Sequence, residues 1–409
     1  MDSPVKAQKV RTAVAPPVAP DGGYAWFIML SCFLVFGLTF GVIKAFGVFY
    51  VEIHEYFGTT ATETSWITSI AVATIHVVAP IASALSAFYS HRFVVITGGL
   101  ICSLGVVFGA FARNLIELYL TVGFLNGFGY ALTWTPTVTM LGLYFEKRRP
   151  VANALASAGE CILTFVFTPL FQLLIDSYSW RGALLILGGL QLNLCVCGML
   201  NFQEMEELTM SDKSDQGTIQ RPELRTKILH YVDYTLITNA HFMVYTMFGV
   251  FAALGFFAPA LFLVPYARSK GIEEYQAAAL MSISAVLDLF GRVFFGWVAN
   301  LRLVQTVPTV ILLGTVLLLC PLASSFSELA TFSAAYGLVF GATVSIHITV
   351  LAEVVGVHRL GSALGFFMLI RSTGGLFGPP IAGERCYCTT ETVKKKLNAA
   401  LRCCCKNSL

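Results

Sequence analysis

Charged residues are scarce in this chain. Only 12% of its 409 residues are Asp, Glu, Lys or Arg, whereas 56% are hydrophobic and the mean hydropathy is +0.74. Soluble domains carry about 25% charged residues, so the composition excludes an ordinary water-soluble protein and indicates one embedded in a lipid bilayer. The formal net charge of +3 is small. Since the sequence also lacks a basic stripe or a nucleic-acid motif, we expect no nucleic-acid partner.

Patterns that would indicate a metal site or an enzyme are also missing. The 11 cysteines form no pair of separated CxxC motifs, so we predict neither a disulfide framework nor a metal site. No nucleophile–base arrangement or phosphate loop appears, which argues against an enzyme and against a bound cofactor. The first apolar run begins near Tyr24; it is too long for a cleaved signal peptide and has no A-x-A site.

Long apolar runs dominate what is present. About 20 such residues cross a bilayer as a helix, and eleven runs qualify: 24–50, 65–88, 93–112, 116–145, 151–175, 180–202, 241–266, 275–300, 304–322, 328–355 and 360–383. We therefore predict an all-α membrane protein with an N-terminal helix bundle (23–202), a polar central loop (203–236), a C-terminal bundle (237–383), and tails at 1–22 and 384–409. Lys and Arg concentrate in loops on the side of the N-terminus, so the positive-inside rule places that terminus in the cytoplasm.

Two of the few charges inside these runs lie close together. Asp288 and Arg292 are four residues apart in run 275–300, on one helix face, where each charge costs about 2.5–3.5 kcal/mol to insert. Burial disfavours an ionised carboxylate and a neighbouring guanidinium favours it, so Asp288 is suited to exchanging a proton. Protonated Asp288 would release Arg292 to hold a carboxylate. The pair predicts movement of an organic monoanion together with H⁺; the alternative is a structural salt bridge.

Two further basic residues complete the candidate site. Lys44 lies about 27 Å along the first helix from Trp26 at 1.5 Å per residue, which predicts a position near the outer mouth, above Asp288 and Arg292. The alternative for Lys44 is snorkelling to the headgroups. Arg371, in the Gly-rich segment RSTGGLFGPP, is a further substrate-binding candidate; the alternative is pairing with a helix terminus or with Glu160. We interpret Glu160 itself as a structural carboxyl group.

Two motifs carry a family resemblance. DGGYAW at 21–26 and YFEKRRPVANALASAG at 144–159 resemble the two signatures of the monocarboxylate transporter family of the major facilitator superfamily. WRG at 180–182 and GPPIAG at 378–383 also fit, so the resemblance covers about residues 20–383. It implies a fold of two six-helix bundles. In proton-coupled members, a Lys of the first span and an Asp/Arg pair of the eighth span bind substrate and proton. The matching positions here are Lys44, Asp288 and Arg292.

The resemblance implies a function and leaves alternatives open. It implies proton-linked transport of lactate, pyruvate and ketone-body-like acids by alternating access, in the plasma membrane, with a single-span immunoglobulin-type partner such as basigin or embigin. The family also contains carriers of creatine, taurine, carnitine, aromatic amino acids and thyroid hormones. One alternative is therefore facilitated transport of another organic solute without proton coupling.

The C-terminus departs from the family pattern. A polar tail rich in Cys and Lys, 384–409, stands where the family has its twelfth span. We expect this truncated ending to weaken folding and surface delivery without altering the substrate. A non-functional truncated isoform is the third hypothesis.

Overall fold

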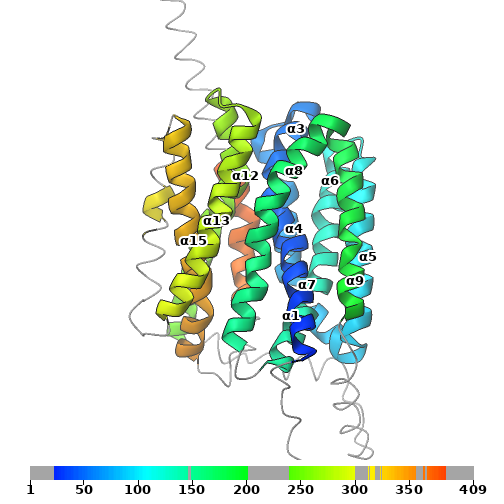
Figure 1. The fold of residues 1–409 in the computed structure, drawn as a ribbon, viewed down its shortest axis with the longest axis vertical. Helices are drawn as coiled ribbons and strands as arrows, with labels where there is room; N and C mark the ends of the chain where they lie inside the picture. The colour runs from blue at the N-terminus through cyan, green and yellow to red at the C-terminus, as the bar shows by residue number, and fades with distance from the viewer. Residues whose placement is uncertain are drawn as a thin grey trace, which may run out of the picture.

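The computed structural model describes residues 23–145, 149–200, 239–299, 312, 314–317, 323, 325–355, 363 and 366–383. Within these ranges every element is a helix, and the long helices run side by side (Figure 1). The N-terminal set comprises α1 (Ala25–Phe36), η1 (Gly37–Gly41), α2 (Val42–Ala45), α3 (Gly47–Phe57), α4 (Ala61–Phe88), α5 (His91–Ala110), α6 (Leu115–Leu118), η2 (Tyr119–Leu125), α7 (Asn126–Tyr144), α8 (Arg149–Gln191) and α9 (Asn193–Leu200). The C-terminal set comprises α12 (Ala240–Ser269), α13 (Glu274–Ala299), α15 (Phe326–Val355) and helical residues 366–383.

The first helical path is longer than hydropathy predicts. Elements α1, η1, α2 and α3 follow one another from Ala25 to Phe57, with a π-helical turn at η1. The path ends at Gly58, whose φ of 59° is in the left-handed region that glycine adopts most readily. The predicted run 24–50 therefore stops seven residues early, because the last two turns are helical but polar.

Helix α8 contains one predicted run and the first half of the next. It spans Arg149–Gln191, and its backbone leaves helical geometry at Ser179, where φ is 61° and ψ is 169°. This break falls between the predicted runs 151–175 and 180–202. The second of these runs continues through α9. The chain therefore reverses direction near residue 179, as Figure 1 shows at the end of the molecule where α8 is bent.

The all-helical membrane fold is confirmed for the described residues. Seven helices there are long and apolar enough to cross a membrane by length and composition. In run 304–322 only residues 312 and 314–317 are described, and they are helical. The tails 1–22 and 384–409 and the loop 203–236 lie outside the described residues, and the boundaries of the two bundles stay a prediction.

Helices α8 and α13 join the N-terminal and C-terminal sets. They pack against each other near the centre of Figure 1; α8 also contacts η1 and α2, and α13 also packs along α15. Two glycines permit close approach at this junction. A side chain at Gly41 would lie 3.2 Å from the carbonyl oxygen of Glu160, and one at Gly341 would meet the carbonyl oxygen of Asp288. The backbones of η1 and α15 therefore lie directly against the segments that carry Glu160 and Asp288.

Candidate functional site

Four ionisable side chains meet where these helices join. Lys44 of α2 donates to Asp288 Oδ2 at 2.6 Å and lies 2.8 Å from Glu160 Oε1. Arg292 reaches the same two carboxylates, with Nε 2.8 Å from Asp288 Oδ1 and Nη2 2.8 Å from Glu160 Oε2. We call Lys44, Glu160, Asp288 and Arg292 the central cluster. Each of its cations contacts each of its carboxylates.

The central cluster is buried and balanced in charge. The exposed fractions of its side chains are 3% for Asp288, 4% for Arg292, 10% for Glu160 and 13% for Lys44. Two positive and two negative groups sum to zero. Balance of this kind is expected because removing one partner of a buried pair costs about 3–5 kcal/mol.

The predicted Asp288–Arg292 pair is confirmed as a contact. Besides the Nε bond, Arg292 Nη2 donates to Asp288 Oδ2 at 3.2 Å, so the guanidinium approaches the carboxylate as a two-pronged fork. A third guanidinium nitrogen, Nη1, donates to the carbonyl oxygen of Ser157 at 3.4 Å. The contact itself does not decide between a substrate site and a structural bridge.

The predicted position of Lys44 is wrong. Lys44 does not lie above the Asp288–Arg292 pair at an outer mouth but contacts Asp288 directly. The distance along the helix explains the error. Lys44 is 13 residues before the end of α3 at Phe57, and Asp288 is 14 residues after the start of α13 at Glu274, so both lie about 20 Å from the same end.

Glu160 is held by two cations, and whether its role is structural stays a prediction. Its two oxygens contact Lys44 and Arg292, not Arg371, so the alternative pairing of Arg371 with Glu160 is not formed. The sequence contained a signal for Glu160, since an acid inside an apolar run is costly. The sequence did not indicate its two partners, because both lie more than 100 positions away along the chain.

A second polar group lies at the end of the molecule where α3 ends and α13 begins. Arg268 of α12 pairs with Glu52 of α3 at 3.2 Å and with Glu274 of α13. From α8, Gln172 donates to Glu274 Oε2 at 3.1 Å, and Asp176 accepts a 2.7 Å bond from the Tyr275 hydroxyl. We call Glu52, Gln172, Asp176, Arg268, Glu274 and Tyr275 the end cluster. It joins the N-terminal and C-terminal helices a second time.

Comparison with known proteins identifies the family. Residues 29–379 match the Major Facilitator Superfamily. Monocarboxylate transporter 2 of Mesocricetus auratus is 37% identical over 390 residues, which are 91% of this chain and 81% of that protein. Monocarboxylate transporter 13 of Rattus norvegicus is 38% identical over 372 residues, 89% of this chain and 83% of that one. The chain belongs to the monocarboxylate transporter family.

The solved structures agree on the fold. A bacterial homologue of the human lysosomal transporter Spinster, in an inward-facing and unoccupied conformation, superposes with a TM-score of 0.71 over 93% of this chain and 86% of that one. Its identity of 17% supports the fold alone. Membership of the monocarboxylate transporter family points to a multi-pass transporter rather than an enzyme.

Arg371 lies beside the central cluster in this family member but does not join it. Its guanidinium carbon is 5.1 Å from the ring centroid of Phe256, and that ring lies 4.9 Å from the ring of Phe340. Lys44 Nζ is 4.2 Å from the same Phe340 ring. Two cations therefore rest on one pair of touching rings. Within the described residues, no carboxylate lies within ion-pair distance of Arg371.

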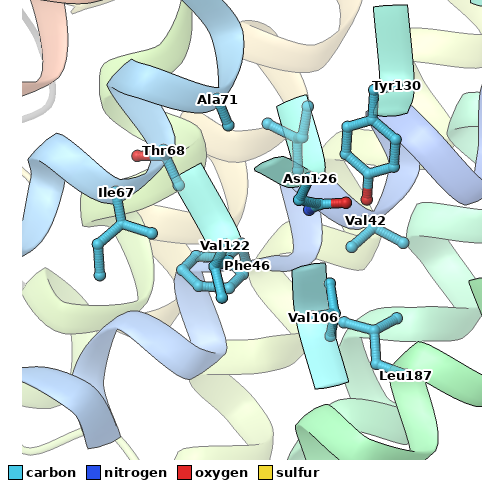
Figure 2. Close-up of a pocket in the computed structure, with 11 residues that line it drawn as sticks. Val42, Phe46, Ile67, Thr68, Ala71, Val106, Val122, Asn126, Tyr130 and Leu187 are labelled. Carbon is cyan, nitrogen blue, oxygen red and sulfur yellow. The ribbon is translucent and has the colours of Figure 1, made fainter. Parts of the chain in front are cut away.

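A cavity among the N-terminal helices of this family member has a different character (Figure 2). It is lined by mostly apolar side chains of α2, α4, α5, η2, α7 and α8, with Thr68, Asn126 and Tyr130 as polar groups. Its lining contains no charged residue. We therefore place the candidate site at the central cluster and Arg371, not in this cavity.

Proposed function

We propose that this chain carries small monocarboxylates such as lactate, pyruvate and ketone-body-like acids across a membrane together with a proton, by alternating access. The observation that carries the proposal is the neutral, buried central cluster at the junction of the two helix sets. A bound monoanion would give the cluster a charge of −1. One proton taken up by a cluster carboxylate returns that charge to zero.

Charge balance explains why coupling to H⁺ is useful. A net charge crossing the membrane is worth about 2.3 kcal/mol per 100 mV. A proton and a monoanion that move together avoid this term, so the solute gradient and the proton gradient alone set the direction of transport. Lys44 and Arg292 supply donors for a carboxylate, and Arg292 can hold one with two parallel bonds.

Arg371 has a separate role in the proposal. Because it has no carboxylate partner among the described residues, it is the cation most available to an incoming anion. The shared rings of Phe256 and Phe340 connect it to Lys44. We assign Arg371 to the first contact with the substrate carboxylate and the central cluster to the coupled step. Delivery to the plasma membrane, an N-terminus in the cytoplasm, and a basigin- or embigin-type partner complete the proposal.

The neutral cluster also supports a second candidate function. Carboxylates and cations side by side can hold both ends of a zwitterion such as an amino acid, creatine or taurine, and no proton is then needed for neutrality. This solute would be carried by facilitated transport, with the Asp288–Arg292 pair acting as a gate.

Uptake into proteoliposomes separates these functions. Purified protein is reconstituted and supplied with radiolabelled lactate, pyruvate, 3-hydroxybutyrate or taurine, with and without an inward proton gradient. We expect acid-stimulated uptake of the monocarboxylates, lost in Asp288→Asn and Arg292→Ala. Arg113→Ala, which removes an exposed arginine from the connection between α5 and α6, is the matched control. Uptake indifferent to pH supports the facilitated carrier, and no uptake of any solute supports the non-functional isoform.

A further inference from the structure

Glu160 occupies the place that a substrate carboxylate would need. Its Oε1 is 2.8 Å from Lys44 Nζ and its Oε2 is 2.8 Å from Arg292 Nη2. A carboxylate that bridges an ammonium and a guanidinium in this way has the geometry of a bound monocarboxylate anion. The side chain therefore covers the two donors that substrate would use. An anion can reach them only if the Glu160 carboxylate loses its charge and withdraws.

The two cluster carboxylates are not held equally. Asp288 makes three bonds, a fork with Arg292 and one with Lys44, and its side chain is 3% exposed. Glu160 makes two contacts and is 10% exposed. Each additional bond from a cation favours the ionised form of a carboxylate. Glu160 is therefore the carboxylate that the two cations hold less firmly.

The remaining surroundings of Glu160 add no further charge. Five titratable or charged groups face it among the described residues, from α2, α8, α13 and α15: Lys44, Cys161, Asp288, Arg292 and Tyr336. Thiol and phenol groups ordinarily ionise only above about pH 8, so the two cations and Asp288 dominate. If Glu160 becomes neutral, the cluster retains an excess of one positive charge for an anion to balance.

We propose that Glu160 carries the coupling proton and that the substrate carboxylate replaces the Glu160 carboxylate between Lys44 and Arg292. The inference rests on the proposed function and names its proton acceptor. In the empty state Glu160 is ionised and the cluster is neutral. A proton from water on the entry side binds to Glu160, the monoanion takes the vacated donors, and both leave to the other side. The cluster is neutral before and after loading, and Asp288 stays ionised throughout.

The substitution Glu160→Gln tests this assignment by fixing the neutral form. The empty variant has an uncompensated positive charge and binds a monoanion without a proton. Stimulation of lactate uptake by acid should fall from as much as about tenfold per pH unit, the limit for one required proton, to about onefold. Uptake should also become sensitive to potential, faster with the liposome interior positive, because the empty carrier now returns with a charge. Glu160→Asp should restore acid stimulation and insensitivity to potential.

The controls separate this inference from the proposed function. Acid-stimulated, potential-independent uptake by the unmodified protein tests proton coupling itself. If that protein shows coupling and Glu160→Gln keeps the same pH and potential dependence, Glu160 is not the acceptor and the inference is overturned. If the unmodified protein shows no coupling, the proposed function is rejected, and the inference that rests on it is rejected with it. Valinomycin and potassium gradients set the potential, and uptake is divided by the amount of reconstituted protein.

Infrared difference spectroscopy keeps the test decisive if Glu160→Gln does not fold. Unmodified protein is labelled with carboxyl-¹³C glutamate in one preparation and carboxyl-¹³C aspartate in another, and lactate is added below neutral pH. We expect a protonated carboxyl band that appears with lactate and shifts only with the glutamate label. A band that shifts with the aspartate label, or no band, overturns the inference.

Discussion

The central cluster and the end cluster use similar residues in opposite surroundings. Both connect α8 to α13 and add a residue from the first helical path. The side chains of the central cluster are 3–13% exposed, whereas Arg268, Glu52 and Glu274 of the end cluster are 23%, 29% and 42% exposed. The central cluster sets two cations against two carboxylates. The end cluster sets one cation, Arg268, against Glu52, Asp176 and Glu274.

The difference in charge balance follows from the difference in hydration. Water near the end cluster solvates its surplus of negative charge, so balance is unnecessary there, and exposed pairs of this kind contribute only about 0–1 kcal/mol. In the dry interior an unbalanced charge is far more costly. The central cluster can therefore take up an anion only if it also takes up a proton, so that its net charge stays zero. This requirement couples the anion to the proton.

The largest expected effect comes from breaking the balance in the interior. Arg292→Ala leaves two carboxylates to share Lys44, and we expect a loss of about 3–5 kcal/mol in unfolding free energy together with loss of lactate uptake. Unfolding in detergent, followed by fluorescence, measures the first, and proteoliposome uptake the second. Arg113→Ala is the matched control. A loss below about 1 kcal/mol would show that water reaches the cluster and that the burial argument fails.

Restoring the balance should recover most of that stability. In the double variant Asp288→Leu with Arg292→Met, one charge of each sign is removed, and Lys44 and Glu160 remain as a neutral pair. Replacing a buried ion pair by apolar side chains is often neutral or stabilising, so we expect unfolding within about 1 kcal/mol of the unmodified protein. Uptake should stay abolished. Equal instability of the double variant and Arg292→Ala would mean that specific contacts, not charge balance, hold the junction.

The sequence predicted the local part of this site and missed the part that depends on tertiary contacts. Asp288 and Arg292 are one helical turn apart, so their pairing follows from helix geometry alone. Glu160 meets them only because α8 packs on α13, and no spacing in the sequence reports that contact. The predicted position of Lys44 was too near one end of the molecule, because the hydrophobic run ends at Tyr50. The helix itself continues to Phe57 through the polar residues Glu52, His54 and Glu55.

Arg371 offers an intermediate case, a cation without a carboxylate partner in the described part of the chain. Arg371→Gln strands no acid among the residues that the structure describes, so we expect little change in unfolding free energy beyond the cation–π contact with Phe256, about 0.5–2 kcal/mol. Binding of the substrate carboxylate should lose a charged hydrogen bond of about 1.5–3 kcal/mol. The half-saturating lactate concentration should therefore rise about ten- to hundredfold, with the pH dependence unchanged. Arg371→Lys should recover part of the affinity; an unchanged half-saturation in Arg371→Gln would remove this residue from the substrate path.

The smallest effect is expected at the end cluster and completes the comparison. Arg268→Gln removes one partner of two partly exposed pairs, and we expect a loss of about 0–1 kcal/mol in unfolding free energy. The loss should shrink between low and high salt, because the Debye length, beyond which exposed charges are largely screened, falls from about 30 Å at 0.01 M to about 3 Å at 1 M. Arg292→Ala, measured in parallel, should lose the same unfolding free energy at low and at high salt, because ions do not reach the buried central cluster. If salt affects the two variants alike, the hydration difference between the clusters does not control their energetics.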